Sequence, residues 1–312
     1  MIGRHGGNLV RITVGAVLAA ALLLLVGGCA DRPVEQQAPP IAVREVAFHT
    51  VLTAPLGDGP AELGGVFPDN AECRVPASYA VTDDAVLILD TLKRRIVEYR
   101  GGALTRVVSV PAVIDGGSIA VGGEGDWYVY DPPTGYVLRL TPRGDVRQRW
   151  AVPDELGATA WLSLKLGRGG EVVLAVGLAE CRLGQTLGQP VDGLSFRGSN
   201  ARYGVRYVDQ HTARVCADGR DRWSVSTDGE LRGVTPLGFA ADGRLIAEAV
   251  DLSLSRRLLV FALAPDGSVT KSVIDMAAFE AYPTPALAVG QDGELYRLGF
   301  TRDRAVLERL TF

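Results

Sequence analysis

The sequence predicts an all-β fold, a β-propeller built from four-stranded antiparallel blades. Three observations support this prediction. Short apolar segments punctuated by Gly and Asp follow one another after residue 43, with almost no helical periodicity. A turn followed by an apolar strand recurs along the chain, and a second hairpin follows most of its copies. Two hairpins in about 45 residues make one four-stranded blade.

The recurring turn contains Asp-Gly or Gly-Gly in most copies, which supplies the positive φ that tight hairpins need. Aligned on residues 84, 125, 170, 243 and 293, its copies are spaced by 41, 45, 73 and 50 residues. The long spacing leaves two alternatives. Either residues 178–220 are an insertion in a five-bladed ring, or they hide a degenerate blade with Tyr203 to Val208 and Ala213 to Ala217 as its inner strands. The length of the chain favours six blades.

The two ends of the repeat region predict how the ring closes. The last unit starts at Ala286 and stops at Phe312, one strand short of a blade. An unmatched strand-like segment, Val43 to Leu52, can supply the missing outer strand. Closure of this kind would remove exposed sheet edges, which otherwise invite aggregation.

The N-terminal segment has the features of an export signal. Arg4 and Arg11 precede an apolar run of about 15 residues, from Ile12 to Val26. A spanning helix needs roughly 20 apolar residues, whereas the apolar core of a cleaved signal needs ~7–15. The alternative is an ordinary anchor helix. We expect a signal peptide over 1–28, a Pro- and Gln-rich tether over 29–42, and the propeller over 43–312.

The end of this segment, Val26-Gly27-Gly28-Cys29, resembles the lipobox of bacterial lipoproteins. The resemblance implies that the Cys29 thiol is acylated, for example with palmitate, and that Cys29 becomes the new N-terminus. It also implies a lipid-anchored protein on the extracytoplasmic side of the cell membrane.

The repeat contains Val129-Tyr130-Asp131 and Ile88-Leu89-Asp90, the latter with Arg94-Arg95-Ile96. In these segments above all, the repeat units resemble NHL-type and related six-bladed propellers of bacterial extracytoplasmic proteins. The resemblance covers residues 70–152 well and 236–312 fairly. It implies the fold and says little about activity, because propellers host binders, scaffolds and enzymes alike.

Charge and composition restrict the partners. Removal of residues 1–28 takes away two arginines and no acid, which leaves 30 basic and 36 acidic residues. Nucleic acid is therefore not expected as a partner. Only His49 and His211 remain after that removal, too few for a multi-histidine zinc site, and no Gly-x-Ser-x-Gly motif occurs. We expect no metal site, no cofactor and no catalytic residues.

Three aspartates, Asp90, Asp131 and Asp251, end the second strands of their units. They could bind Ca²⁺ or act as bases, but recurrence across units favours a structural role in capping turns. In the aromatic segment that follows residue 126, strand alternation puts Trp127 on one face and Tyr128 on the other, and burial between neighbouring blades explains both.

The longest non-repeating stretch is 188–200. Such departures from a repeat are typical places for function, and a neutral insertion is the alternative. This stretch follows a second strand, so we expect it on the same rim as the turns after Asp131 and Asp251. Those two aspartates are candidate binding residues, and the irregular region adds Arg182, Asp192, Phe196 and Arg197.

Three cysteines remain besides Cys29, which allows one disulfide and one free thiol. Cys181 and Cys216 flank the same irregular region and are the candidate pair; three buried thiols are the alternative.

The sequence thus predicts a cell-envelope lipoprotein whose propeller is a non-catalytic binding module for another envelope protein or an extracellular ligand. The alternative is a propeller enzyme, a hydrolase or lyase that uses carboxylates at the channel mouth, with or without calcium.

Overall fold

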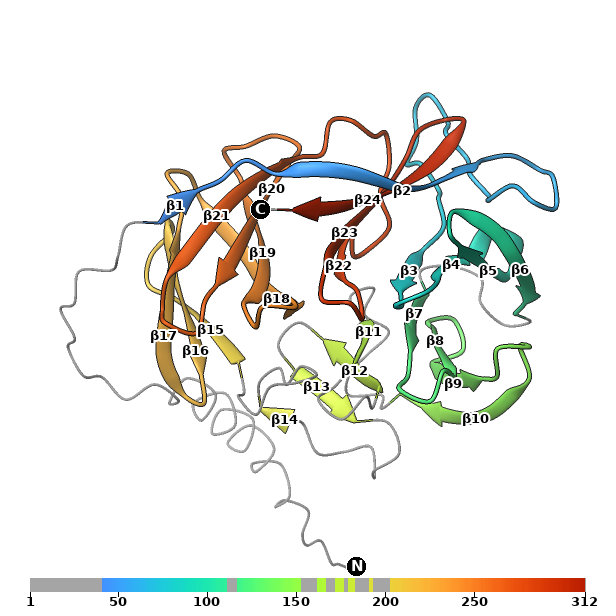
Figure 1. Cartoon of the computed structure of the whole chain (residues 1–312), viewed down its shortest axis with the longest axis horizontal. Coiled ribbons are helices and arrows are strands. Elements are labelled where there is room, and N and C mark those ends of the chain that lie inside the picture. Colours follow the sequence, from blue (N-terminus) through green and yellow to red (C-terminus); the bar gives the residue numbers. More distant parts are fainter. Residues whose placement is uncertain are drawn as a thin grey trace, which may run out of the picture.

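Among the described residues, the strands form six β-sheets arranged around a central axis (Figure 1). The structure is a computed structural model that describes residues 41–110, 117–152, 162–166, 172–176, 179–182, 191–192 and 203–311. Within the described ranges, the one helical turn is a 3₁₀ turn at Thr91–Lys93. Among the described residues, no helix has the length and apolar character needed to span a bilayer.

The first three sheets each contain four strands in chain order, joined as antiparallel hairpins. The first sheet consists of β3 (Ser78–Val81), β4 (Val86–Asp90), β5 (Arg95–Arg100) and β6 (Ala103–Ser109). The second sheet consists of β7 (Ser118–Val121), β8 (Trp127–Asp131), β9 (Tyr136–Leu140) and β10 (Val146–Ala151). The third sheet consists of β11 (Leu162–Leu166), β12 (Val172–Val176), β13 (Ala179–Arg182) and β14 (Val191–Asp192).

The remaining sheets include the N-terminal strands. The fourth sheet consists of β15 (Tyr203–Tyr207), β16 (Thr212–Ala217) and β17 (Arg220–Ser226). The fifth sheet consists of β18 (Leu231–Phe239), β19 (Leu245–Asp251), β20 (Arg257–Leu263) and β21 (Val269–Asp275), with β1 (Ala42–Val43) added at its edge. The sixth sheet consists of β22 (Leu287–Val289), β23 (Leu295–Phe300), β24 (Arg304–Thr311) and β2 (Ala47–Pro55).

The propeller prediction is confirmed, and so is closure by an N-terminal strand. β2 pairs antiparallel with β24 and completes the sixth sheet, the blue strand along the top of Figure 1. Its bounds differ from the predicted segment Val43 to Leu52. Residues 42–43 pair in parallel with β21 of the fifth sheet instead. The N-terminal segment therefore bridges two blades.

The 73-residue spacing in the repeat contains strands of its own. β15 and β16 lie where the degenerate blade was predicted, but neither takes the place of a blade's first strand, the strand nearest the central axis. In the first sheet, the backbone nitrogen of Val110, just after the fourth strand, donates to the carbonyl oxygen of Arg94 in the turn between the second and third strands. In the fourth sheet, the backbone nitrogen of Thr227, just after β17, donates in the same way to His211 in the turn between β15 and β16. β15 and β16 thus occupy the places of second and third strands. The count of six blades stays a prediction.

The hydrophobic core is divided into clusters that lie between neighbouring sheets. Along β4, Val86 and Ile88 pack toward the sixth sheet, whereas Leu87 and Leu89 pack toward the second. Likewise Trp127 of β8 belongs to the cluster with the first sheet. Its neighbour Tyr128 packs on the other side, against the third sheet, as predicted. Both faces of β4 and β8 are therefore buried, because alternating side chains of one strand serve two interfaces.

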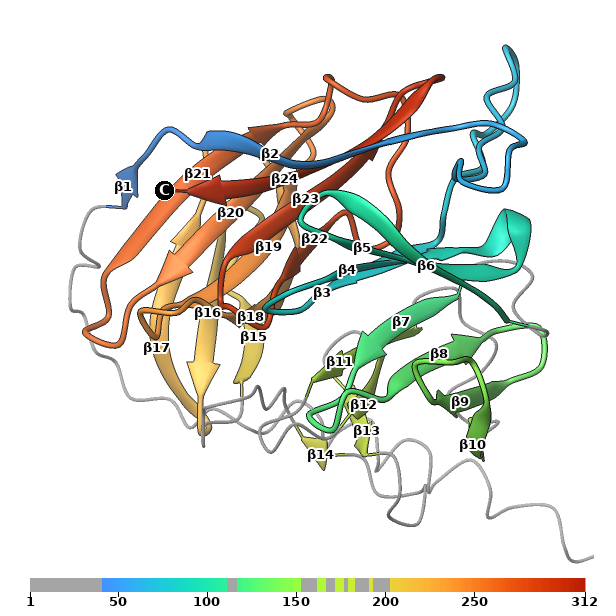
Figure 2. The same cartoon turned by 45° about the vertical axis from the view of Figure 1, so that its right-hand side comes forward.

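The first strands of the sheets surround the central axis, and we call them inner strands. β3 contacts β7 and β22, β7 contacts β11, and β18 contacts β22. Figure 2 shows the sheets splayed around this axis. The turns that leave the inner strands use glycine where the sequence predicted it: Gly125, Gly243 and Gly293 have φ values of 81°, 83° and 78°.

Candidate functional site

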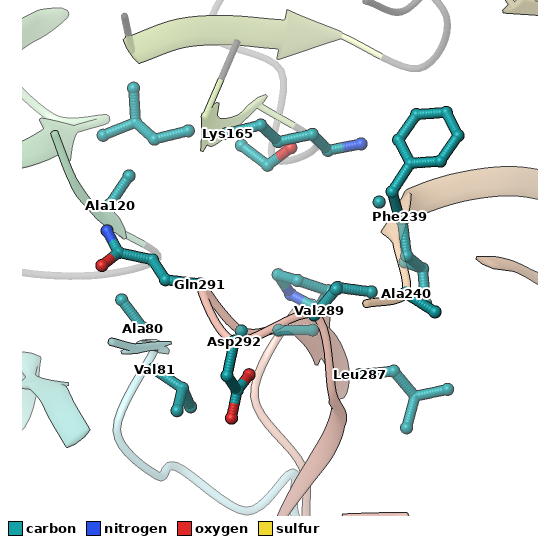
Figure 3. Close-up of a pocket in the computed structure, with 18 of the residues that line it drawn as sticks. Ala80, Val81, Ala120, Lys165, Phe239, Ala240, Leu287, Val289, Gln291 and Asp292 are labelled. Carbon is teal, nitrogen blue, oxygen red and sulfur yellow. The ribbon is translucent and has the colours of Figure 1, made fainter. Parts of the chain in front are cut away.

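A cavity of about 870 Å³ lies in the central channel of the ring. Its walls are the inner strands, and the turns Ala240 to Gly243 and Gly290 to Gly293 form part of its lining (Figure 3). The volume lies within the roughly 300–1,000 Å³ typical of sites for small molecules. We call this space the channel pocket.

One position of the repeat faces the channel pocket in every described inner strand. It is the penultimate residue of that strand, and it pairs with the second residue of the next strand. Four of these wall residues are small, and the third sheet alone carries a long charged one. The wall residues are Ala80, Ala120, Lys165, Gly238 and Ala288.

Lys165 reaches from β11 across the pocket toward the fifth sheet. In Figure 3 its side chain extends from the third sheet toward Phe239, with the nitrogen at the far end. Its Nζ lies 3.5 Å from the carbonyl oxygen of Pro236 on β18. The small residues at the other wall positions leave open the space that the Lys165 side chain spans.

Glu248 of β19 is the carboxylate that interacts with Lys165. It interrupts a buried apolar strand and lies deep in the ring, although its side chain keeps some contact with solvent. Burial raises the pKa of Glu248 to about 7, because an apolar surrounding disfavours the charged form, while the positive charge of Lys165 acts in the opposite direction. Near neutral pH this carboxyl therefore exchanges a proton.

Tyr79 of β3 borders the same region. Its hydroxyl lies 3.1 Å from the carbonyl oxygen of Ala286 and 3.0 Å from that of Tyr296. Burial, followed by the negative charge of Glu248, raises the pKa of Tyr79 well above its ordinary value. The phenol consequently stays neutral and ties the first sheet to the sixth.

The turn Gly290 to Gly293 closes part of the pocket floor. The backbone nitrogen of Gln291 donates to Val81 at 3.1 Å, and its side-chain amide donates to Val121 at 3.3 Å. These bonds join the sixth sheet to the first and second. The carboxylate of Asp292 accepts hydrogen bonds from the hydroxyl of Tyr296 at 2.5 Å and from the nitrogen of Glu294 at 3.0 Å. In Figure 3 it points away from Lys165.

The structure does not bring the predicted binding aspartates into this pocket. Asp131 and Asp251 are buried at the ends of β8 and β19, at the rim opposite the turns that line the pocket. Asp131 accepts from Thr134 at 2.5 Å, and Asp251 accepts from the nitrogen of Ser253 at 2.9 Å. Both carboxylates thus make the turn-capping contacts considered from sequence.

These environments change the two pKa values in opposite directions. Burial raises the pKa of Asp131, and its bond from Thr134 only partly offsets that effect. Burial also disfavours the charge of Asp251, but hydrogen bonds from Ser253 and Thr227 outweigh it, so the pKa of Asp251 is lowered.

The other predicted site residues are not tested. The side chains of Arg182 and Asp192, on β13 and β14, lie outside the described part, as do Phe196, Arg197 and Cys29. Their roles stay predictions.

The proposed disulfide also stays a prediction, because the side chain of Cys181 lies outside the described part. Cys216 is buried, and its thiol donates a hydrogen bond to Asp221 at 3.0 Å. Cys73 is a free, half-buried cysteine.

Sequence reasoning missed Lys165 and Glu248. Both carried a signal, since Lys165 is one of three lysines in the chain and stands at a repeat position that holds Ala or Gly in the other described inner strands. Glu248 stands alone in the apolar run Leu245 to Val250. Among the described residues, no cluster of His, Cys, Asp and Glu could hold a metal ion.

The fold and the channel pocket define a class, a β-propeller with a ligand-sized central cavity. No protein-family profile matches the chain, and no curated protein does. Solved structures match it as β-propeller-like proteins. The PQQ-bound form of aldose sugar dehydrogenase from Streptomyces coelicolor is 12% identical, with a TM-score of 0.51 over 88% of this chain and 100% of that one.

Two further solved structures are similar to the chain. A member of the DUF4221 family from Bacteroides vulgatus is 10% identical, with a TM-score of 0.50 over 86% of this chain and 98% of that one. A streptogramin B lyase is 10% identical, with a TM-score of 0.47 over 85% and 98%. At such identities the likeness shows the fold alone.

Proposed function

We propose that this protein is a lipid-anchored propeller of the bacterial cell envelope that binds a small ligand in its channel pocket and releases it unchanged. The cavity of about 870 Å³ carries this proposal. Its lining combines apolar side chains with polar ones such as Lys165 and Gln291, and such a combination occurs in binding sites for small molecules. The lipobox-like end of the N-terminal segment supports attachment to the membrane through Cys29.

The pocket supports binding through the rigidity of its frame. Each wall residue belongs to a paired strand, and Gln291 links three of the sheets across the floor. A site on strands loses little conformational entropy when a ligand binds, because its side chains are already held in place. Another envelope protein, bound at the rim that carries Asp131 and Asp251, remains a second partner in this proposal.

The alternative is an enzyme, and one observation favours it. Glu248 has a pKa of about 7 next to a lysine at the channel, which is the state expected of a group that takes up and gives back a proton. Under this alternative Glu248 would act as a general base on a ligand in the channel.

One experiment separates the two functions. The full-length protein, extracted in mild detergent, is incubated with the small-molecule fraction of a bacterial envelope extract, and the retained compounds are identified by mass spectrometry. The control is Ala80→Phe, which fills the pocket from a wall position. Binding predicts a compound that wild type retains unchanged and the control does not. A compound recovered in altered form supports the enzyme, and equal retention by both proteins contradicts the proposal.

A further inference from the structure

We propose that one outer edge of the ring docks on the lipid bilayer that holds the anchor. Its basic side chains contact anionic phosphate groups of the lipids, and its exposed apolar side chains enter the layer between those groups. This proposal rests on the proposed function, because it needs the anchor at Cys29, and it adds how the propeller is oriented on the membrane. We call the surface the docking edge; it consists of Val43, Arg44, Phe48, Lys271, Val273 and Arg309.

The docking edge is continuous, although its residues come from two sheets. Val43 pairs with Lys271, and the backbone nitrogen of Arg44 donates to the carbonyl oxygen of Lys271 at 2.9 Å. The chain then enters β2, where His49 pairs with Arg309 of β24. Figures 1 and 2 both show β1, β2 and β21 together at the perimeter of the ring.

Apolar side chains of the docking edge are exposed to solvent. Val43 is 68% exposed, the highest value among the large apolar residues of the described ranges. Phe48 and Val273 are each 38% exposed. Exposed apolar side chains are normal when they are scattered, but in a group they mark surfaces for proteins or membranes. Together with basic residues they are typical of surfaces that lie in the headgroup region of a bilayer.

The docking edge is basic, whereas the chain is acidic. Arg44, Lys271 and Arg309 are engaged in no ion pair within the described part of the chain. The acids beside them are Glu45 and Asp275, and the carboxylate of Asp275 already accepts a hydrogen bond from a backbone nitrogen at 2.7 Å. Each basic side chain close to an anionic bilayer strengthens association about fivefold. The charge of this edge therefore suits anionic lipids.

The position of the anchor identifies the bilayer as the occupant. Ala42 is held on β21 by strand pairing, and residues 30–42 connect it to Cys29. A chain of that length reaches at most about 45 Å when it is fully extended. The lipid on Cys29 thus keeps the docking edge near the bilayer, and such a high effective concentration turns a weak attraction into a lasting contact.

Docking through this edge leaves both rims of the ring accessible. The outer strands lie at the perimeter, whereas the channel pocket lies on the central axis. With the docking edge on the bilayer, that axis runs along the membrane surface. A ligand can then reach the channel pocket from the aqueous side, and the rim that carries Asp131 and Asp251 stays open to another protein.

Hydroxyl-radical footprinting of the full-length protein in nanodiscs tests the proposal. One disc contains phosphatidylcholine alone, and the other also contains phosphatidylglycerol. Phe48 is the probe, and Tyr136 is the internal control, because it is 41% exposed and belongs to β9, across the ring from β1. We expect oxidation of Phe48 to fall at least about threefold in the anionic disc, because three basic residues together favour docking about a hundredfold. Oxidation of Tyr136 should be the same in both discs.

A pair of charge reversals locates the contact. Arg44→Glu combined with Lys271→Glu should return oxidation of Phe48 in the anionic disc to its value in the neutral disc. The matched control is Arg143→Glu combined with Arg149→Glu, at exposed positions that also lack an ion pair in the described ranges. This control should keep the protection. Melting curves show whether each variant is folded, and added salt should weaken docking of the wild type without any substitution.

Four results would overturn the proposal. Equal oxidation of Phe48 in the two discs, from a protein that carries its acyl group, would refute docking and leave the anchor intact. A protein without an acyl group would contradict the anchor of the proposed function, and docking with it. Protection that grows with protein concentration in detergent would assign the docking edge to a second copy of the chain. Protection that survives Arg44→Glu with Lys271→Glu would exclude anionic headgroups as the partner.

Discussion

The hydroxyl oxygen of Ser118 lies 3.0 Å from the backbone nitrogen of Leu164 and accepts its hydrogen bond across the junction of the second and third sheets. Ser78 makes the same contact with Ile119 at the preceding junction, at 3.4 Å. Both serines are the first residues of their inner strands. One position of the repeat therefore ties each of these blades to the next, directly beside the channel pocket.

We expect Ser118→Ala to destabilise the protein by about 1–3 kcal/mol. The substitution leaves a buried backbone N–H without its acceptor, which costs the desolvation free energy of that group. Urea unfolding measures the change. Ser268→Ala is the matched control, because that serine is exposed and bonds only within its own turn, to Asp266. Equal effects of the two substitutions would show that the inter-blade bond contributes nothing.

Removal of β2 should open the ring. Leu52 and Ala54 of this strand are 3% and 0% exposed, and they pack in the cluster between the sixth and first sheets. Burial of a leucine side chain contributes about 1.5–3 kcal/mol, and the edge of β24 becomes exposed as well. A chain that begins at Leu56 should lose its cooperative thermal transition.

The control for this truncation begins at Val46 and keeps β2. It removes the segment before β2, including β1, and should still unfold cooperatively by circular dichroism or calorimetry. If both truncated chains melt alike, the closure of the ring does not depend on β2.

Much of this fold could be predicted because the repeat shows in short stretches of sequence, through its turn residues and the alternation of its strands. Asp-Gly turns fixed the hairpins, and the alternation at Trp127 and Tyr128 gave the correct faces. The bounds of the closing strand were wrong at both ends, because β2 runs over Ala47–Pro55 and its pairing with β24 is set by the inward side chains of Leu52 and Ala54. Nothing local shows that Ala42 and Val43 pair with a different sheet.

The candidate site could be predicted less well, since it depends on ring geometry. Lys165 and Glu248 belong to different sheets and interact only because the ring brings β11 and β19 to one channel. Alignment of the inner strands would have marked Lys165 as an exception among small residues. The burial that raises the pKa of Glu248 arises only when the blades assemble, so no local sequence pattern predicts it.

The proposed membrane anchor can be tested independently of the propeller. Cys29→Ala should leave an unlipidated, full-length precursor, because the resemblance to a lipobox implies that the thiol is the site of acylation. Lipidation is measured by metabolic labelling with a fatty acid. Signal cleavage is measured by the apparent mass of the protein in membrane fractions. Normal maturation and lipid labelling of the variant would contradict the lipoprotein prediction. Cys73→Ala is the control and should behave as wild type.

Glu248 should make the stability of the protein fall as pH rises. Its pKa is about 7 in the folded state against an ordinary value of 4.5, so the folded protein holds this proton more tightly than the unfolded chain. Below pH 4.5 the group is neutral in both states and costs nothing. Between about pH 4.5 and pH 7 the folded state loses stability, and the full cost of a buried charge is present above pH 7.

Glu248→Gln removes this cost, because the amide is neutral at every pH. A raised pKa of this size corresponds to at most about 3 kcal/mol. We therefore expect the variant to gain about 1–3 kcal/mol over wild type at pH 8 and little at pH 5, as measured by urea unfolding at both values. Glu72→Gln is the exposed control and should show the same small difference at each pH. A gain for Glu248→Gln that is equal at pH 5 and pH 8 would show that the carboxyl does not titrate in this window.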